Sequence, residues 1–276
     1  MIIRIVSGIV LGVGVALIFT LHPLAAAALI WLGISLGLAE VRHLLGESWQ
    51  TPGYLVQVLL LALVVYTFVA GGPAGTPLTA GWLAFLAGVF LLVPLGEKML
   101  AGPVEPGAAL RGYVGSVFGV AALILATSTA LLVSPGLFPW ALPGALAVCW
   151  AGDAGGLFAG SLLGREKLAP ALSPKKTREG AVGTLFASAL VATAIYLGWE
   201  PARLMAPSWW WVFLAGLVVG FLTIVGDLSG SYLKRLMGVK DASRLLPGQG
   251  GVFDKSDSLI LALPTLTLLM LLGSRL

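Results

Sequence analysis

Long apolar runs separated by short polar stretches dominate the chain. About nine of these runs are long enough to cross the hydrocarbon core of a bilayer as helices, which takes roughly 20 residues. They cover residues 2–20, 23–39, 54–71, 79–96, 114–133, 137–157, 181–198, 208–225 and 258–273. The pattern predicts an all-α integral membrane protein, a bundle of about nine transmembrane helices with a cytoplasm-facing polar site. We expect a single polytopic membrane domain, residues 1–276, with N-terminal helices in 1–133 and the functional helices and loops in 134–276.

Composition supports a membrane protein and excludes or disfavours several kinds of functional site. Hydrophobic residues make up 58% of the chain and charged residues 10%, whereas about a quarter of the residues in soluble proteins are charged. Cys149 is the only cysteine, so an intramolecular disulfide is excluded. The only histidines, His22 and His43, are far in sequence from the charged C-terminal third, which disfavours histidine metal sites and catalytic triads. The phosphate loops GxxxxGK[ST] and GxGxxG are both absent.

The positive charges predict the orientation. If all nine runs span the membrane, every Lys and Arg except Arg203 and Arg275 falls on the same side of it as the N-terminus. Cytoplasmic loops carry the excess of Lys and Arg. We therefore expect a multi-pass protein of the cell (inner) membrane, with its N-terminus and both polar segments, 153–180 and 226–258, in the cytoplasm.

The first polar segment combines one acid with several cations. Asp153 stands in an otherwise apolar helix, and an acid at that depth is a functional hypothesis by default; capping or hydrogen bonding inside the bundle is the alternative. Cations and backbone N–H groups hold phosphates well, although these cations could also serve only as the cytoplasmic topology signal. The cations are Arg165, Lys167, Lys175, Lys176 and Arg178.

The second polar segment combines acids and bases at helical spacing. Asp227, Ser231 and Lys234 lie at i, i+4 and i+7 and therefore share one helix face. Asp254 and Asp257 stand at the start of the last apolar run. The intervening LPGQGG must turn, so the chain can fold back and bring Asp227 near Asp254. Two carboxylates without His or Cys suit a hard cation such as Mg²⁺; plain salt bridges are the alternative.

The second segment resembles the signature of the phosphatidate cytidylyltransferase family, also called CDP-diacylglycerol synthases. The family pattern is Ser-x-x-Lys-Arg, a Lys-Asp pair, a Pro-Gly-His-Gly-Gly turn and a closing Asp-Arg-x-Asp. The matching residues are Ser231, Lys234, Arg235, Lys240, Asp241, Pro247, Gly248, Gly250, Gly251, Asp254 and Asp257. The first segment is similar to the family's upstream region through Asp153, Lys167 to Pro170, Ser173, Pro174, Lys176, Thr177, Glu179 and Gly180.

The resemblance implies that the protein makes CDP-diacylglycerol and pyrophosphate from CTP and phosphatidate at the bilayer, with no nucleic-acid partner. It implies Mg²⁺ on the acids matching Asp227 and Asp254, with a two-metal site as an option and a homodimer left open. The implied catalytic residues are Asp227, Asp254, Lys234, Arg235 and Asp257. The implied substrate-binding residues are Asp153, Lys167, Ser173, Lys175, Lys176, Thr177, Glu179, Ser231, Lys240, Asp241, Gly248, Gln249, Gly250 and Gly251.

Three positions depart from the family pattern. Gln249 replaces His, Gly230 stands where Glu is usual, and Lys255 replaces Arg. Gln cannot carry charge and Gly offers no metal ligand. Two alternatives therefore stay open: a CTP-dependent enzyme acting on an isoprenoid lipid or lipid alcohol, and a catalytically silent relative that binds lipid or nucleotide. A transporter is disfavoured because the sequence shows no internal symmetry between halves.

Overall fold

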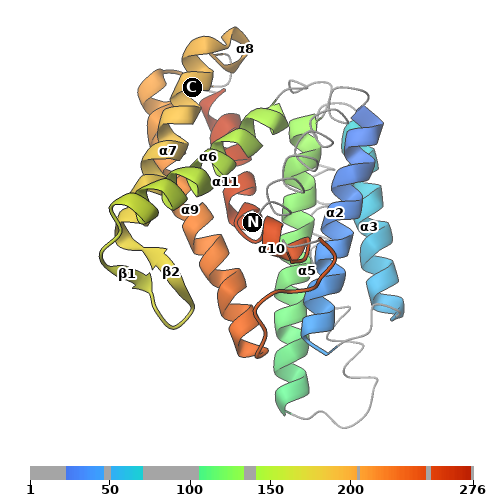
Figure 1. Ribbon diagram of the computed structural model, residues 1–276. Helices are drawn as coiled ribbons and strands as arrows, with labels where there is room; N and C mark the ends of the chain where they lie inside the picture. Colours follow the sequence, from blue (N-terminus) through green and yellow to red (C-terminus); the bar gives the residue numbers. More distant parts are fainter. Residues whose placement is uncertain are drawn as a thin grey trace. The chain divides into compact units, whose positions relative to one another are not determined.

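The computed structural model describes residues 23–46, 51–70, 106–133, 141–203, 206–246 and 250–274. Helices dominate these residues (Figure 1). The chain divides into two compact units: a first unit of residues 1–137 with 241–254, and a second unit of residues 138–240 with 255–276. The expected spans at 2–20 and 79–96 lie outside the described residues.

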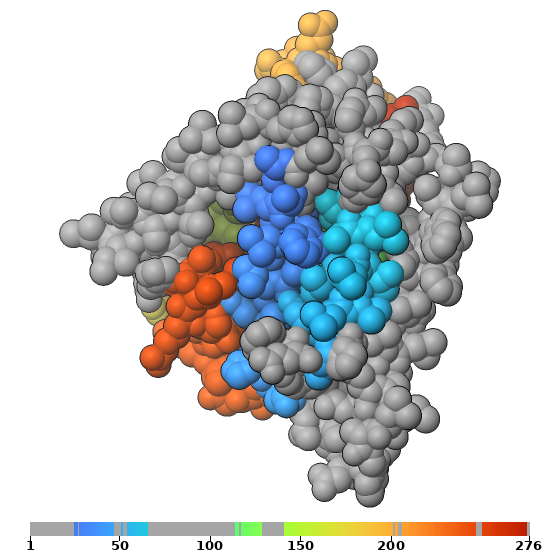
Figure 2. Space-filling model, turned by 90° about the vertical axis from the view of Figure 1, so that its right-hand side faces the viewer, coloured from blue at the N-terminus to red at the C-terminus, as the bar shows by residue number. Residues whose placement is uncertain are grey.

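Among its described residues, the first unit contains three long helices that pack on one another. They are α2 (Pro23–Leu44), α3 (Pro52–Ala70) and α5 (Pro106–Val133). Each begins with proline, whose missing N–H and fixed φ suit the first helical turn. Leu38, Leu61 and Leu123, one from each helix, belong to a single buried cluster. Figure 2 shows α2 in blue and α3 in cyan side by side.

A buried arginine fixes α2 against the start of α3. Arg42 is 2% exposed and donates hydrogen bonds to Gln57 Oε1 at 3.1 Å and Thr51 Oγ1 at 2.9 Å. Its guanidinium also lies 6.0 Å from the centre of the Tyr54 ring, and the Tyr54 hydroxyl donates to the Ser35 carbonyl. A buried charge is tolerated where hydrogen bonds replace its lost hydration, so this network makes α2 a fixed support.

The second unit contains the remaining helices and a hairpin. Helix α6 packs on α7, α7 on α9, and α9 on α11. The elements that belong wholly to this unit are α6 (Ala141–Leu162), β1 (Lys167–Ala169), β2 (Ser173–Thr177), α7 (Arg178–Gly198), α8 (Glu200–Arg203), α9 (Trp209–Leu236) and α11 (Leu259–Gly273). The short helix α10 (Phe253–Ser256) precedes α11 in the chain.

Glycines allow the helices of the second unit to approach closely. A Cβ atom added to Gly155 of α6 would lie 2.9 Å from the Gly183 carbonyl oxygen of α7. A Cβ at Gly216 of α9 would lie 2.5 Å from the Cα of Ala189. Small residues at such crossings bring backbones together, which is a common way for membrane helices to associate.

Strands β1 and β2 form an antiparallel hairpin between α6 and α7 (Figure 1). Lys167 pairs with Thr177, and Ala169 with Ser173. The all-α prediction was wrong for this segment. Its residues mix apolar and polar types without regular alternation and include Pro170 and Pro174, so they lack the pattern by which a strand is predicted.

Four helical segments among the described residues are long and apolar enough to cross a membrane. They are Ala141–Leu162, Arg178–Gly198, Trp209–Leu236 and Phe253–Gly273. Tyr54–Val65 and Val117–Ser128 are shorter apolar helical stretches. The chain is therefore a membrane protein, while the count of nine spans stays a prediction.

Candidate functional site

A salt bridge joins the two polar segments of the sequence. Lys176, on β2, places its Nζ 2.6 Å from Asp227 Oδ2, on α9. Ser231 lies one turn further along α9 and donates to Asp227 Oδ1 at 3.4 Å, as the predicted helix face requires. The side chains of Lys176 and Asp227 are 24% and 35% exposed. An acid and a base are therefore held together where a ligand can reach them.

Asp153 adds a second acid to this cluster. It lies in the C-terminal half of α6 and interacts electrostatically with both Asp227 and Lys176. The cluster thus draws on α6, β2 and α9. Asp153 stands inside α6 and therefore caps no helix end, while hydrogen bonding inside the bundle stays the alternative.

Lys234 and Asp257 form a buried pair, and Asp257 also interacts electrostatically with Asp227 of the cluster. Lys234 Nζ lies 3.3 Å from Asp257 Oδ2, and their side chains are only 9% and 6% exposed. Asp257 Oδ1 also accepts a hydrogen bond from the Ser258 N–H at 2.8 Å. This geometry ties the end of α9 to the start of α11. The catalytic roles expected of both residues stay predictions.

Gly230 makes room for that pair. A Cβ atom at this position would lie 2.6 Å from both Cβ and Oδ2 of Asp257. Such distances are shorter than van der Waals contact permits. In this chain, the glycine found where the family usually carries Glu is therefore required by the packing of Asp257.

Two predicted substrate-binding residues also have structural roles at the start of α7. Thr177 is the N-cap, and its Oγ1 accepts from the Gly180 N–H at 3.1 Å. Glu179 Oε2 accepts from the Arg165 N–H at 3.0 Å. These bonds fix the hairpin that carries Lys176. The predicted residues that lie exposed are Asp153, Lys167, Lys175, Arg235, Lys240 and Asp241, while Ser173 is partly buried.

Asp254 closes a loop in the first unit. Its Oδ2 accepts hydrogen bonds from the backbone N–H groups of Ala242 and Gly251, both at 2.8 Å. Gly250 has a φ of +91°, in the region that favours glycine. Gly248 and Gln249 lie outside the described residues.

The predicted Mg²⁺ site on Asp227 and Asp254 stays a prediction. Carboxylate oxygens, as on Asp227 and Asp254, are the ligands that Mg²⁺ prefers. Within the described residues, no three His, Cys, Asp or Glu side chains gather as a metal-binding group. Asp227 belongs to the second unit and Asp254 to the first, so their proximity stays a prediction.

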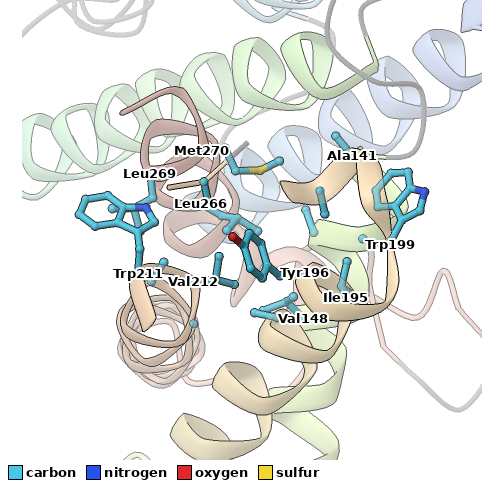
Figure 3. A pocket seen from close by; sticks show the side chains of 17 residues that line it. Ala141, Val148, Ile195, Tyr196, Trp199, Trp211, Val212, Leu266, Leu269 and Met270 are labelled. Atoms are coloured by element: carbon cyan, nitrogen blue, oxygen red, sulfur yellow. The ribbon is translucent and has the colours of Figure 1, made fainter. Parts of the chain in front are cut away.

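An apolar cavity of about 90 Å³ lies between the helices of the second unit (Figure 3). Tyr196, Trp211 and Met270 are among its lining residues. It lies where α6 and α9 begin, whereas Asp153 and Asp227 lie toward the ends of the same helices. With no charged residue in its lining, this cavity is unsuited to a triphosphate, so the Asp153–Lys176–Asp227 cluster is the candidate site.

Comparison with known proteins identifies the family. The sequence model described as "Cytidylyltransferase family" matches residues 2–272. The chain belongs to this family. The resemblance seen in the two polar segments is confirmed, and it extends to the N-terminal helices as well.

Curated relatives carry a more specific name. Proteins named phosphatidate cytidylyltransferase are 42% identical over 116 residues in Brucella suis biovar 1 (strain 1330) and 38% identical over 127 residues in Staphylococcus haemolyticus (strain JCSC1435). The first match covers 42% of this chain and 41% of the relative, and the second 46% and 47%. A protein of that name in Haemophilus influenzae (strain ATCC 51907 / DSM 11121 / KW20 / Rd) is 41% identical over 117 residues, 42% of this chain and 40% of the relative. The matches thus span less than half the length of these relatives.

Proposed function

We propose that this protein is a phosphatidate cytidylyltransferase, which makes CDP-diacylglycerol and pyrophosphate from CTP and phosphatidate. The match of the family over residues 2–272 and the names of the relatives support this assignment. The observation that carries it is the contact between Lys176 and Asp227. It joins the two segments that hold the family's motifs into one cluster of acids and bases.

The reaction needs little acid–base chemistry. An oxygen of the phosphatidate phosphate attacks the α-phosphorus of CTP and forms a new P–O bond. The bond from the α-phosphorus to the oxygen bridging the α- and β-phosphates breaks, and pyrophosphate leaves with the electron pair. A phosphate monoester has its second pKa at about 6, so the nucleophile is already largely ionised at neutral pH. A general base, such as the His that Gln249 replaces, is not required.

The residues of the cluster fit the charge that this reaction develops. Lys176 and the exposed Lys167 and Lys175 on the same hairpin would bind the triphosphate and the lipid phosphate. Asp227 and Asp254 would hold Mg²⁺, singly or as a two-metal site, and Lys176 keeps Asp227 in place beforehand. When bound, Mg²⁺ would neutralise negative charge on the phosphate oxygens.

The same proposal places the site at a membrane surface. Phosphatidate presents its phosphate at the headgroup level, whereas CTP arrives from water. A polar cluster at the ends of spanning helices meets both substrates. We propose nine spans in the inner membrane with the N-terminus and the site in the cytoplasm, and leave a homodimer open.

Pyrophosphate release by the purified protein in detergent tests this function. We expect release that requires CTP, phosphatidate and Mg²⁺ together. Asp227→Asn should lower the rate at least about 100-fold, as expected when preorganised charge at the reacting phosphate is lost. Glu200→Gln, a matched change at an exposed residue of α8, should leave the rate unchanged. Release without phosphatidate, or none with any lipid phosphate, would reject the proposal.

A further inference from the structure

Glu40 is a buried acid that the sequence motifs leave unexplained. It lies on α2 and is 8% exposed. Its Oε1 accepts hydrogen bonds from Ser243 Oγ at 2.7 Å and from the Val252 N–H at 3.1 Å. Its Oε2 accepts one from the Phe253 N–H at 2.7 Å. These three hydrogen bonds hold Ser243 and the backbone of Val252 and Phe253 against the Glu40 side chain.

These bonds hold both ends of one loop of the first unit. Ser243 lies near the start of residues 241–254, and Val252 and Phe253 lie near the end. Asp254 follows Phe253 directly and closes the same loop through the Ala242 N–H. The position of the Asp254 carboxylate is therefore set by Glu40 through the backbone of its neighbours.

The two glycines of the turn fit this arrangement. A Cβ atom at Gly251 would lie 2.6 Å from the carboxyl carbon of Glu40. A Cβ atom at Gly250 would lie 2.5 Å from Asp254 Oδ2. Carboxylates thus occupy the space that side chains would need at both positions. The adjacent glycines of the family motif are explained by two acids, one of which comes from a distant part of the sequence.

Glu40 is itself held by a rigid element. Two residues further along α2, Arg42 donates to Gln57 and to Thr51. Precise placement of a reacting group needs supporting residues whose own positions are locked. Helix α2 provides this support because Arg42 locks it against α3.

We propose that Glu40 is a positioning residue, which holds Ser243, Val252 and Phe253 so that Asp254 presents its carboxylate to the reaction. The proposal rests on the proposed function. Glu40 is buried and bonded to protein groups, so it acts through the loop and not on the substrates. The role is one that none of the family's motifs assigns, because Glu40 lies about 200 residues before the loop.

Glu40→Gln tests the role with little change of shape. The amide keeps one acceptor oxygen and turns the other into an N–H donor, which faces a backbone N–H. We expect kcat to fall about 10- to 100-fold, with KM for phosphatidate changed less than about threefold, because small misplacements of reacting groups cost rates of this order. Amide hydrogen exchange at residues 251–253 should become faster in the same variant, whether or not substrates are present.

A second variant and a folding check distinguish loss of the Glu40 contact from general misfolding. Gly251→Ala places a methyl group on the Glu40 carboxylate and should reproduce both effects, while Glu200→Gln should produce neither. Both variants should elute from size exclusion as the wild type does. Unchanged kcat with an active wild type, or a lower kcat with unchanged exchange at 251–253, would overturn the positioning role. An inactive wild type would instead reject the proposed function, and faster exchange would then show only that Glu40 holds the loop.

Discussion

At Gly230 the backbone of α9 comes so close to Asp257 that a methyl group does not fit. The sequence could show only that Glu is usual in the family at this position, and that Gly supplies no ligand. The structure adds that Asp257 and Lys234 fill the space. At the residue scale, packing against Asp257 explains why this chain carries Gly230 where the family usually carries Glu.

Replacing Gly230 with the family's Glu should therefore destabilise this protein. Gly230→Glu forces a side chain and a charge against the buried Asp257. We expect a loss of at least about 1–3 kcal/mol of unfolding free energy, as is typical of overpacking, measured by denaturant unfolding in detergent. Ser229→Glu adds the same charge at an exposed neighbour and should cost less than about 0.5 kcal/mol. Equal stability of both variants would contradict this interpretation.

Sequence reasoning singled out three residues that the structure brings together, and it missed Glu40. Asp153, Lys176 and Asp227 stood out because charges are rare in this chain and follow motif spacing. Glu40 gave the same signal as Asp153, an acid within an apolar helix, but it belongs to no local motif. Its partners lie more than 200 residues away, and only the folded chain brings them together.

At the scale of elements, α9 is longer than its apolar run. The run ends near residue 225, whereas the helix continues to Leu236 and carries Asp227, Ser231 and Lys234 on its polar extension. Hydropathy located the apolar parts of α6, α7 and α11 within a few residues, because burial in lipid dictates them. It could not locate helix extensions or the β1–β2 hairpin, which depend on local hydrogen bonds.

The Lys234–Asp257 pair should act as a link between α9 and α11. Removing one partner leaves a buried charge without its counter-ion, which typically costs about 3–5 kcal/mol. We expect Lys234→Met and Asp257→Leu each to destabilise by about this amount and the double variant to lose less than their sum. A double-mutant cycle on unfolding free energies measures the coupling. Additive losses of unfolding free energy would show that the two side chains do not interact.

At the scale of the whole molecule, the orientation in the membrane is open to direct measurement. The hairpin and α8 lie beyond opposite ends of α7, whose 21 residues extend about 30 Å. Glu166 precedes β1 and Glu200 begins α8, and both are exposed. Cys149 is fully buried, so it should not react with added reagents.

Cysteines at these two positions should label from opposite sides. With a membrane-impermeant maleimide on intact spheroplasts, we expect Glu200→Cys to react at once and Glu166→Cys to react only after permeabilisation. The reason is the excess of Lys and Arg on the hairpin side, which predicts a cytoplasmic location. The reverse pattern would invert the proposed orientation, and equal reaction at both positions would show that α7 does not span.

The central claim concerns which phosphate of CTP reaches the lipid. The most direct measurement incubates the protein with phosphatidate, Mg²⁺ and CTP labelled at either the α- or the γ-phosphate, and then counts the label in the organic extract. Transfer of the cytidylyl group predicts α-label in the lipid fraction and γ-label only in aqueous pyrophosphate. Label from the γ-phosphate in an added isoprenoid alcohol would indicate a CTP-dependent lipid kinase instead. Absence of α-label from phosphatidate products would contradict the account.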